Sequence, residues 1–279
     1  MMLPVNTLSC LTWDTLDING VEMKGIREKQ GWSFSARGYQ KALLNGVDPD
    51  RYGQQARIEA RPKSAVTLEA ARKEYATNTV RSFPRYFIIE PTAVCNRACP
   101  FCTILVTNRK GMMKWNHFIK LITECSEYDV YGISLYQLGE PFLWRHGRLD
   151  ISDMVTAAKR TGGFHVVNLS TNGDVPNLSC ILGSEIDDLI ISIDGTSQDV
   201  YSANRPLPNG KPSSLSQTVE RVTRFLDHKT RLKLKQPWVR MQIINKADTA
   251  IEIADFIRFW IAQPGVDDVF VKNLDSMNA

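Results

Sequence analysis

Three cysteines, Cys95, Cys99 and Cys102, lie within one short segment at residues 90–102. Their spacing is C-x3-C-x2-C, and three soft thiolates on one loop can each bind one iron of a cubane cluster. A fourth cysteine would complete the coordination of such a cluster. Three leave one iron without a protein ligand, and a catalytic metal needs an open coordination position. The spacing therefore predicts an iron–sulfur cluster that takes part in chemistry.

Two other interpretations of these cysteines are open. A zinc ion would need a fourth ligand, for which His117 or Cys125 is available in the sequence. Three unligated core cysteines are a weaker alternative, because Asn96, Arg97 and Pro100 do not suit a buried strand. The tight spacing favours the cluster over both alternatives.

The chain as a whole has the composition of an ordinary globular protein, with 43% hydrophobic and 23% charged residues among 279. A chain of this length can bury a sizeable core. It therefore needs neither disulfides nor a structural metal to fold, and a metal site in it points to chemistry.

Charge and cysteine usage set limits on partners and location. The formal net charge of +4 is too small to indicate nucleic-acid binding by itself. Basic residues at alternate positions from His228 to Lys235 are interpreted as a solvated segment between a helix and a strand, with contact to phosphate or an acidic peptide as the alternative. The N-terminus does not resemble a secretory signal, and no apolar stretch is long enough to cross a bilayer. We therefore expect a cytoplasmic protein with no membrane segment. In a reducing compartment, a tight cluster of cysteines indicates metal binding or catalysis rather than disulfides.

Short apolar runs alternate with amphipathic segments from residue 81 to residue 279. This alternation predicts an α/β fold, in which six right-handed units form a partial (β/α)6 TIM-like barrel. Functional residues in such barrels lie on the loops after the strands, which is where the three cysteines fall. The predicted strands are 86–90, 132–136, 165–170, 188–193, 238–244 and 268–271, and the predicted helices are 115–128, 151–160, 215–226 and 251–261.

Residues 1–80 are interpreted as an N-terminal α+β extension whose role the sequence does not reveal. Apolar and polar residues alternate on both sides of Asn19-Gly20. This pattern predicts a β-hairpin, because Asn-Gly favours a type I′ turn. The spacing of apolar residues further predicts a helix at about 67–80.

The cysteine loop, with the aromatic Phe101 directly before Cys102, resembles the signature of the radical S-adenosylmethionine (radical SAM) superfamily. The resemblance covers about residues 85–273. It implies a [4Fe–4S] cluster held by the three cysteines and S-adenosylmethionine bound at the open iron. In that family, one electron from the cluster cleaves the cofactor to a 5′-deoxyadenosyl radical, which abstracts hydrogen from a substrate.

Further motifs follow the second and third predicted strands. Residues 137–141 resemble the family's Gly-Gly-Glu-Pro motif, although Leu138 stands where the first glycine is usual. The resemblance implies that Gly139 and Glu140 receive the methionine ammonium, and a carboxylate suits a cationic amine. Ser170 and Asn172, around a Thr-Asn-Gly motif, are implied in polar contacts to the ribose or methionine. A simple turn is the alternative in both places.

The fourth predicted strand ends with Ser192 and Asp194, which alternate with apolar residues and therefore share one face. Buried polar groups inside a barrel need partners, and a ribose would supply them. The resemblance implies that both residues lie by the ribose and that Arg205 reaches the cofactor carboxylate. An ordinary surface position is the alternative for Arg205. Phe101 is expected to pack beside the cluster or the adenine and to exclude water.

The predicted function is cleavage of S-adenosylmethionine and hydrogen abstraction from a peptide or an amino-acid-derived metabolite, with flavodoxin or ferredoxin as electron donor. The same chemistry on a nucleoside or nucleic acid is one alternative, consistent with a pI of about 8.7. A non-catalytic electron-transfer or structural iron–sulfur protein is an alternative of another class. No cysteine follows Cys180, so the auxiliary clusters of many family members are not expected, and the chain is either a minimal enzyme or a piece of a longer one.

Overall fold

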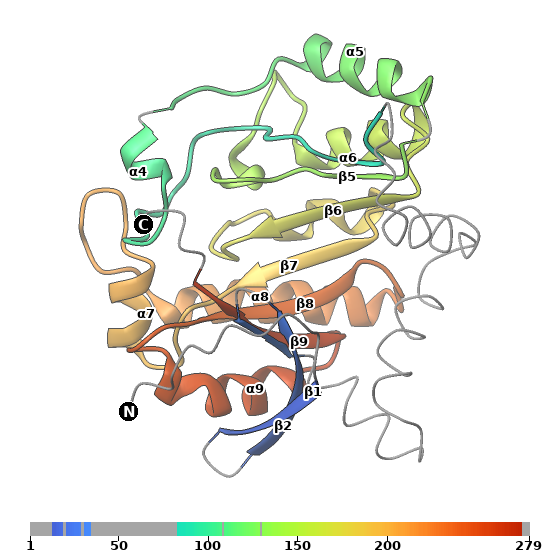
Figure 1. Ribbon diagram of the computed structural model, residues 1–279. Helices are drawn as coiled ribbons and strands as arrows, with labels where there is room; N and C mark the ends of the chain where they lie inside the picture. The colour runs from blue at the N-terminus through green and yellow to red at the C-terminus, as the bar shows by residue number, and fades with distance from the viewer. Residues whose placement is uncertain are drawn as a thin grey trace.

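The computed structural model of the chain describes backbone and side chains at residues 83–107, 109–128 and 130–274. It also describes the backbone of three strands at 13–18, 21–28 and 31–34. The helix predicted at about 67–80 and the cysteine at position 10 lie outside the described residues. Within the described residues the chain forms a three-stranded and a six-stranded sheet (Figure 1).

The larger sheet is parallel throughout, and its strands follow one another in chain order. Among the described residues the last strand does not pair with the first, so the sheet is open and the predicted partial (β/α)6 barrel is confirmed. The strands are β4 (Tyr86–Ile88), β5 (Gly132–Ser134), β6 (Val166–Thr171), β7 (Asp188–Ser192), β8 (Trp238–Asn245) and β9 (Asp268–Asn273).

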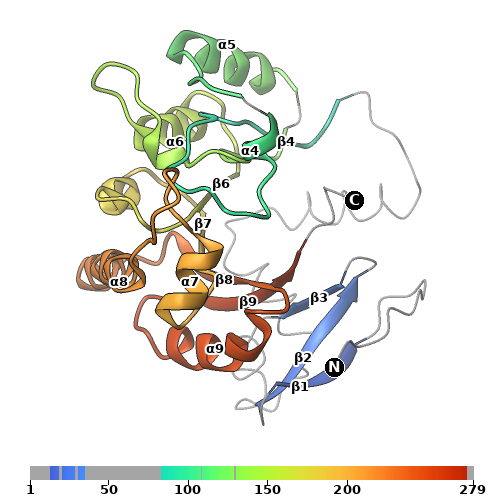
Figure 2. The ribbon, with the colours of Figure 1, turned by 90° about the vertical axis from the view of Figure 1, so that its left-hand side faces the viewer.

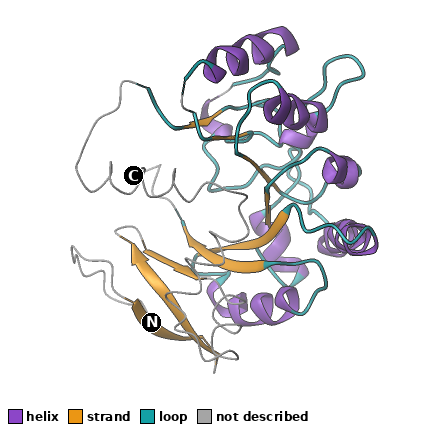
Figure 3. Cartoon of the chain, turned by 90° about the vertical axis from the view of Figure 1, so that its right-hand side faces the viewer, coloured by secondary structure: helices purple, strands orange, loops and turns teal. Residues whose placement is uncertain are grey.

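Four long helices cover one face of the curved sheet (Figures 2 and 3). Alternate strand residues, such as Leu189 and Ile191, are fully buried within the core under these helices. None of the described helices has both the length and the apolar character needed to cross a bilayer. The long helices are α5 (Trp115–Ser126), α6 (Ile151–Arg160), α8 (Leu215–Arg231) and α9 (Ile253–Ile261); the shorter ones are α4 (Ile104–Thr107), α7 (Gln198–Asn204), η1 (Pro141–Leu143), η2 (Leu178–Gly183) and η3 (Ala250–Glu252).

Helix α6 shows why the helix boundaries follow from the sequence. The side chain of Asp150 accepts a hydrogen bond from the Ser152 N–H at 2.8 Å, and the Asp153 side chain accepts one from the Asp150 N–H at 2.8 Å. This capping box satisfies amides that the first helical turn leaves unpaired. Lys159 and Arg160 occupy the last turn, where the helix dipole favours positive charge, and the predicted bounds are confirmed.

Helix α8 differs from the prediction, because it continues to Arg231 instead of ending near residue 226. Its last turn contains Lys229, which is buried and donates hydrogen bonds to the Asp267 carboxylate at 2.5 Å and the Gly265 carbonyl at 3.1 Å. The interpretation of the whole basic segment as solvated is therefore wrong at Lys229. A buried ammonium is tolerated there because both acceptors face it.

The smaller sheet is antiparallel, and it is built from β1 (Trp13–Ile18), β2 (Val21–Glu28) and β3 (Gly31–Phe34). Ile18 pairs with Val21, so the hairpin predicted around Asn19-Gly20 is confirmed. The third strand, β3, lies beside β9 at the end of the large sheet (Figure 2).

Candidate active site

The cysteine loop follows β4 and lies at the carboxyl edge of the parallel sheet, near α4 and α7 (Figure 1). Backbone hydrogen bonds join it to the segments after two other strands. The Ala98 N–H donates to the Pro206 carbonyl at 2.9 Å, and the Glu140 N–H donates to the Val94 carbonyl at 2.9 Å. Neighbouring strand ends therefore fix the conformation of this loop.

The three predicted ligands are free thiols in this loop. Cys99 is buried, and Cys95 and Cys102 are half-buried. Burial and, to a smaller extent, the negative charge of Glu140 together raise the pKa of Cys95 to about 12. Burial also raises the pKa of Cys99, against the positive charge of Arg205. An iron bound to these sulfurs would displace their protons, as metals do at thiol ligands.

The donor set at this loop is three thiols. Among the side chains that the structure describes, no group of three or more His, Cys, Asp and Glu converges as a site for one metal ion. Cys125 lies in the hydrophobic core on α5, and His117 is exposed on the same helix. Neither completes the zinc site considered from the sequence. In a cluster each thiolate binds an iron of its own, which three cysteines on one loop can supply.

Gly139 lies where no larger residue fits. A Cβ on it would meet the Thr92 carbonyl oxygen at 1.9 Å and the Val94 carbonyl oxygen at 3.0 Å. The absence of a side chain therefore allows the loop after β5 to contact the backbone that leads into the cysteines. This contact places Glu140 next to Cys95 electrostatically.

The carboxylate of Glu140 is buried and already has three donors. It accepts hydrogen bonds from Thr171 Oγ1 at 2.8 Å, from the Asn172 N–H at 2.8 Å and from the Phe142 N–H at 3.2 Å. Burial raises the pKa of Glu140 to about 7, although these donors oppose the shift. A carboxylate has about four lone-pair sites, so one acceptor position is left for another donor.

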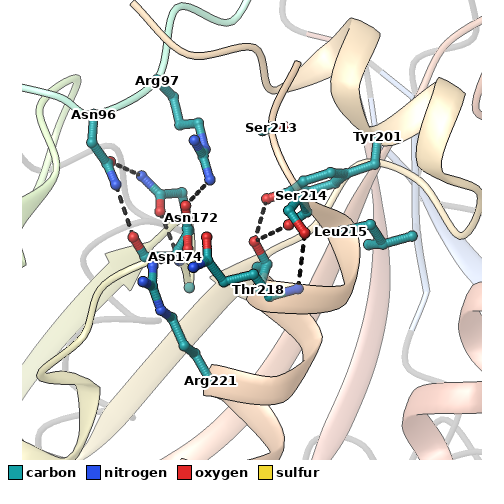
Figure 4. Close-up of polar contacts among 12 residues, drawn as sticks. Asn96, Arg97, Asn172, Asp174, Tyr201, Ser213, Ser214, Leu215, Thr218 and Arg221 are labelled. Carbon is teal, nitrogen blue, oxygen red and sulfur yellow. Dashed lines mark hydrogen bonds and ion pairs between the residues drawn. The ribbon is translucent and has the colours of Figure 1, made fainter. Parts of the chain in front are cut away.

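Asn172 joins the cysteine loop to the end of β6. Its Nδ2 donates to Asn96 Oδ1 at 2.7 Å, and its Oδ1 accepts from the Asp174 N–H at 2.9 Å (Figure 4). Ser170 is half-buried on β6 and takes no part in this network. Of these two predicted residues, Asn172 therefore contacts the cysteine loop with its side chain, and Ser170 does not take part in these contacts.

Asp194 and Arg205 form a buried ion pair. Arg205 Nε donates to Asp194 Oδ2 at 2.7 Å, and the Ile244 N–H donates to Asp194 Oδ1 at 2.8 Å. The protein itself therefore supplies partners that the sequence suggested a ribose would supply. Arg205 is not a surface residue, because its side chain is only 10% exposed. Ser192 likewise has a partner of its own, since its Oγ accepts from Gln242 Nε2 at 3.0 Å.

Two cations lie near the ring of Phe101. The guanidinium carbon of Arg205 is 5.8 Å from the centre of its ring, and the Lys246 ammonium is 5.7 Å from it. Such contacts are favourable because the face of an aromatic ring is electronegative. Phe101 thus connects the cysteine loop to the Asp194–Arg205 pair at the same edge of the sheet.

Glu90 was not selected from the sequence, although it is part of this edge. Its Oε1 accepts hydrogen bonds from the Leu138 N–H at 2.9 Å and the Gly139 N–H at 3.3 Å, and its Oε2 pairs with Arg109 at 2.9 Å. An acidic residue at the end of a strand, next to a glycine-containing turn, is the signal that could have identified it.

Comparison with known proteins reveals relatives by structure alone. No protein-family model matches the chain, and no curated protein matches it in sequence. SuiB from Streptococcus suis bound to precursor peptide SuiA matches with a TM-score of 0.53 and 15% identity, covering 85% of this chain and 52% of that one. SuiB bound to S-adenosylmethionine matches with a TM-score of 0.53 and 17% identity, covering 86% of this chain and 50% of that one. Native anSMEcpe with bound AdoMet matches with a TM-score of 0.54 and 17% identity, covering 69% and 52%.

These matches are to radical SAM enzymes, so the chain has the fold of that class and the resemblance noted in the sequence is confirmed at the level of the fold. The chain spans about half the length of each of these three structures.

Proposed function

We propose that this chain is a radical SAM enzyme in which Cys95, Cys99 and Cys102 hold a [4Fe–4S] cluster with one open iron. When bound, the cluster and S-adenosylmethionine supply the chemistry, an electron that cleaves the cofactor and a carbon radical that abstracts hydrogen from a substrate. The observation that carries this proposal is the position of the three thiols, on one fixed loop at the carboxyl edge of an open parallel barrel.

The surrounding residues have distinct roles in the proposal. Gly139 lets the backbone of residues 138–140 approach the cysteine loop, and Glu140 offers a buried acceptor near Cys95. The Asp194–Arg205 pair holds a guanidinium close enough to act on Cys99 electrostatically. An ammonium and a carboxylate, as in a methionine end, would find opposite charges at these two places.

For the substrate, we propose a peptide or an amino-acid-derived metabolite. The support is that two proteins with this fold have been solved with peptides, SuiB with precursor peptide SuiA and anSMEcpe with the Cp18Cys peptide. A one-electron donor such as flavodoxin or ferredoxin, and a cytoplasmic location, belong to the same proposal. A reducing environment is where free clustered thiols persist.

Cofactor turnover tests the proposed activity. The purified chain is reconstituted with iron and sulfide without oxygen, then given dithionite and S-adenosylmethionine, and 5′-deoxyadenosine is measured by mass spectrometry. We expect the nucleoside to form with the wild-type chain and not with Cys99→Ala. A wild-type chain that binds a cluster but forms no 5′-deoxyadenosine would show a non-catalytic iron–sulfur protein instead.

A second variant separates ligand loss from unfolding. Cys125 is also a buried cysteine, but it lies in the core on α5. Cys125→Ala should keep both cluster absorbance and 5′-deoxyadenosine formation, whereas Cys99→Ala loses both and keeps its far-UV circular dichroism. Equal iron content in wild-type and Cys99→Ala protein would contradict the ligand assignment.

A further inference from the structure

Arg97 is a buried arginine whose hydrogen bonds are incomplete. Only 3% of the residue is exposed, and its Nη2 pairs with Asp174. Its Nε and Nη1 are buried and have no hydrogen-bond partner. Buried donors on a cation are costly to leave unpaired, so their presence in a folded protein calls for an acceptor.

Asp174 holds this guanidinium in place from the end of β6 (Figure 4). One of its carboxylate oxygens pairs with Arg97 and the other with Arg221 from α8. Its backbone is fixed as well, because its carbonyl accepts from Asn96 Nδ2 at 2.8 Å and its N–H donates to Asn172 Oδ1 at 2.9 Å. An arginine anchored in this way cannot swing out to solvent to satisfy its remaining donors.

Arg97 is itself part of the cysteine loop. Arg97 lies between Cys95 and Cys99 in the sequence. Cys99, two residues further along the loop, is buried as Arg97 is. The nearest anionic group that the proposed function would bring here is therefore the cluster with its thiolates.

We propose that Arg97, positioned by Asp174, donates its unpaired Nε–H and Nη1–H to sulfur atoms of the cluster and its thiolates. This inference rests on the proposed function. Hydrogen bonds to cluster sulfurs and nearby positive charge stabilise the more negative, reduced state, and so raise the reduction potential. Arg97 then sets the reduction potential of the cluster, and Asp174 is the positioning residue, which also reduces the effect of Arg97 by partly neutralising its charge.

Two variants that shift the midpoint potential of the cluster in opposite directions distinguish this role of Arg97 from a merely structural one. Arg97→Gln removes the positive charge and the guanidinium donors and leaves a shorter, uncharged amide, so the midpoint potential of the reconstituted cluster should become more negative. Asp174→Asn removes the neutralising charge and keeps an acceptor for the guanidinium, so the potential should become less negative. Both are measured by a redox titration followed by electron paramagnetic resonance, without S-adenosylmethionine, at equal iron content.

The matched control is Arg224→Gln, which removes the same charge from an exposed position on α8 and should leave the potential unchanged. If Arg97→Gln does not fold, the midpoint potential of Asp174→Asn alone decides. A potential that is not less negative than that of the wild type then overturns this inference. A folded, iron-replete Arg97→Gln chain with the wild-type potential overturns this inference and leaves the proposed function intact. A change of midpoint potential in Arg97→Gln that occurs only after S-adenosylmethionine is added also overturns this inference, because the acceptor for Arg97 is then the cofactor. A wild-type chain that binds no iron overturns both.

Discussion

The Cα of Gly139 lies so close to Thr92 that a Cβ at position 139 would be 1.9 Å from the Thr92 carbonyl oxygen. The obstacle is backbone, which cannot rotate away as a side chain can. The loop after β5 and the loop that carries the cysteines therefore form one packed unit, and each one's conformation depends on the other.

Gly139→Ala should separate these two loops. Overpacking against a fixed backbone typically lowers the free energy of unfolding by ~1–3 kcal/mol, and urea unfolding should show a loss in this range. The control is Gly183→Ala, because nothing lies within 4 Å of a Cβ at that position. If both variants unfold at the same urea concentration as the wild type, the close contact does not exist in solution.

Breaking the Asp194–Arg205 pair should destabilise the chain strongly. Arg205→Gln leaves the carboxylate of Asp194, which is fully buried, without its cation. Removing one partner of a buried pair costs about 3–5 kcal/mol, measurable as a lower free energy of unfolding in urea.

The exposed pair of Arg224 with Glu220 on α8 provides the comparison. Because solvent screens such pairs, Arg224→Gln should cost less than about 0.5 kcal/mol. Similar losses in the two variants would argue that Arg205 is solvated in the folded protein.

Cys180 should react slowly with alkylating reagents. Burial and, to a smaller extent, the nearby carboxylate of Asp150 together raise the pKa of its thiol to about 12. Only the thiolate reacts, and a pKa of about 12 instead of the ordinary 9.0 reduces the thiolate fraction at pH 8 by about 1000-fold. Peptide mass spectrometry after timed iodoacetamide treatment measures the rate at this cysteine alone.

Asp150→Asn tests the cause of that shift. Asparagine caps helices about as well as aspartate, so α6 should keep its start while the negative charge is lost. Labelling of Cys180 should then become faster with unchanged circular dichroism. An unchanged or slower rate would show that Asp150 does not act on this thiol.

The sequence predicted the parts of the fold that depend on local patterns. Strand and helix positions followed from hydrophobic periodicity, and the bounds of α6 followed from its cap and its basic end. The extension of α8 to Arg231 was missed because Lys229 looks like a surface residue until its partner Asp267 is known. A contact with a distant segment decided that boundary.

The candidate site shows the same division. The spacing of Cys95, Cys99 and Cys102 is local and was readable directly. The contact of Arg97 with Asp174 joins residues 77 positions apart, and the sequence around neither residue indicates it. Arg205 could be assigned to the surface or the site with equal reason until the structure placed it against Asp194.

Metal analysis of the chain purified without oxygen tests the central claim most directly, namely that the three cysteines of the loop bind an iron–sulfur cluster. Iron and acid-labile sulfide are counted per chain for the wild type and for Cys95→Ala, Cys102→Ala and Cys180→Ala. We predict about four irons and four sulfides per chain in the wild type and in Cys180→Ala, and a large loss of both in the two loop variants. Zinc in place of iron, or no metal dependent on the loop cysteines, would contradict this account.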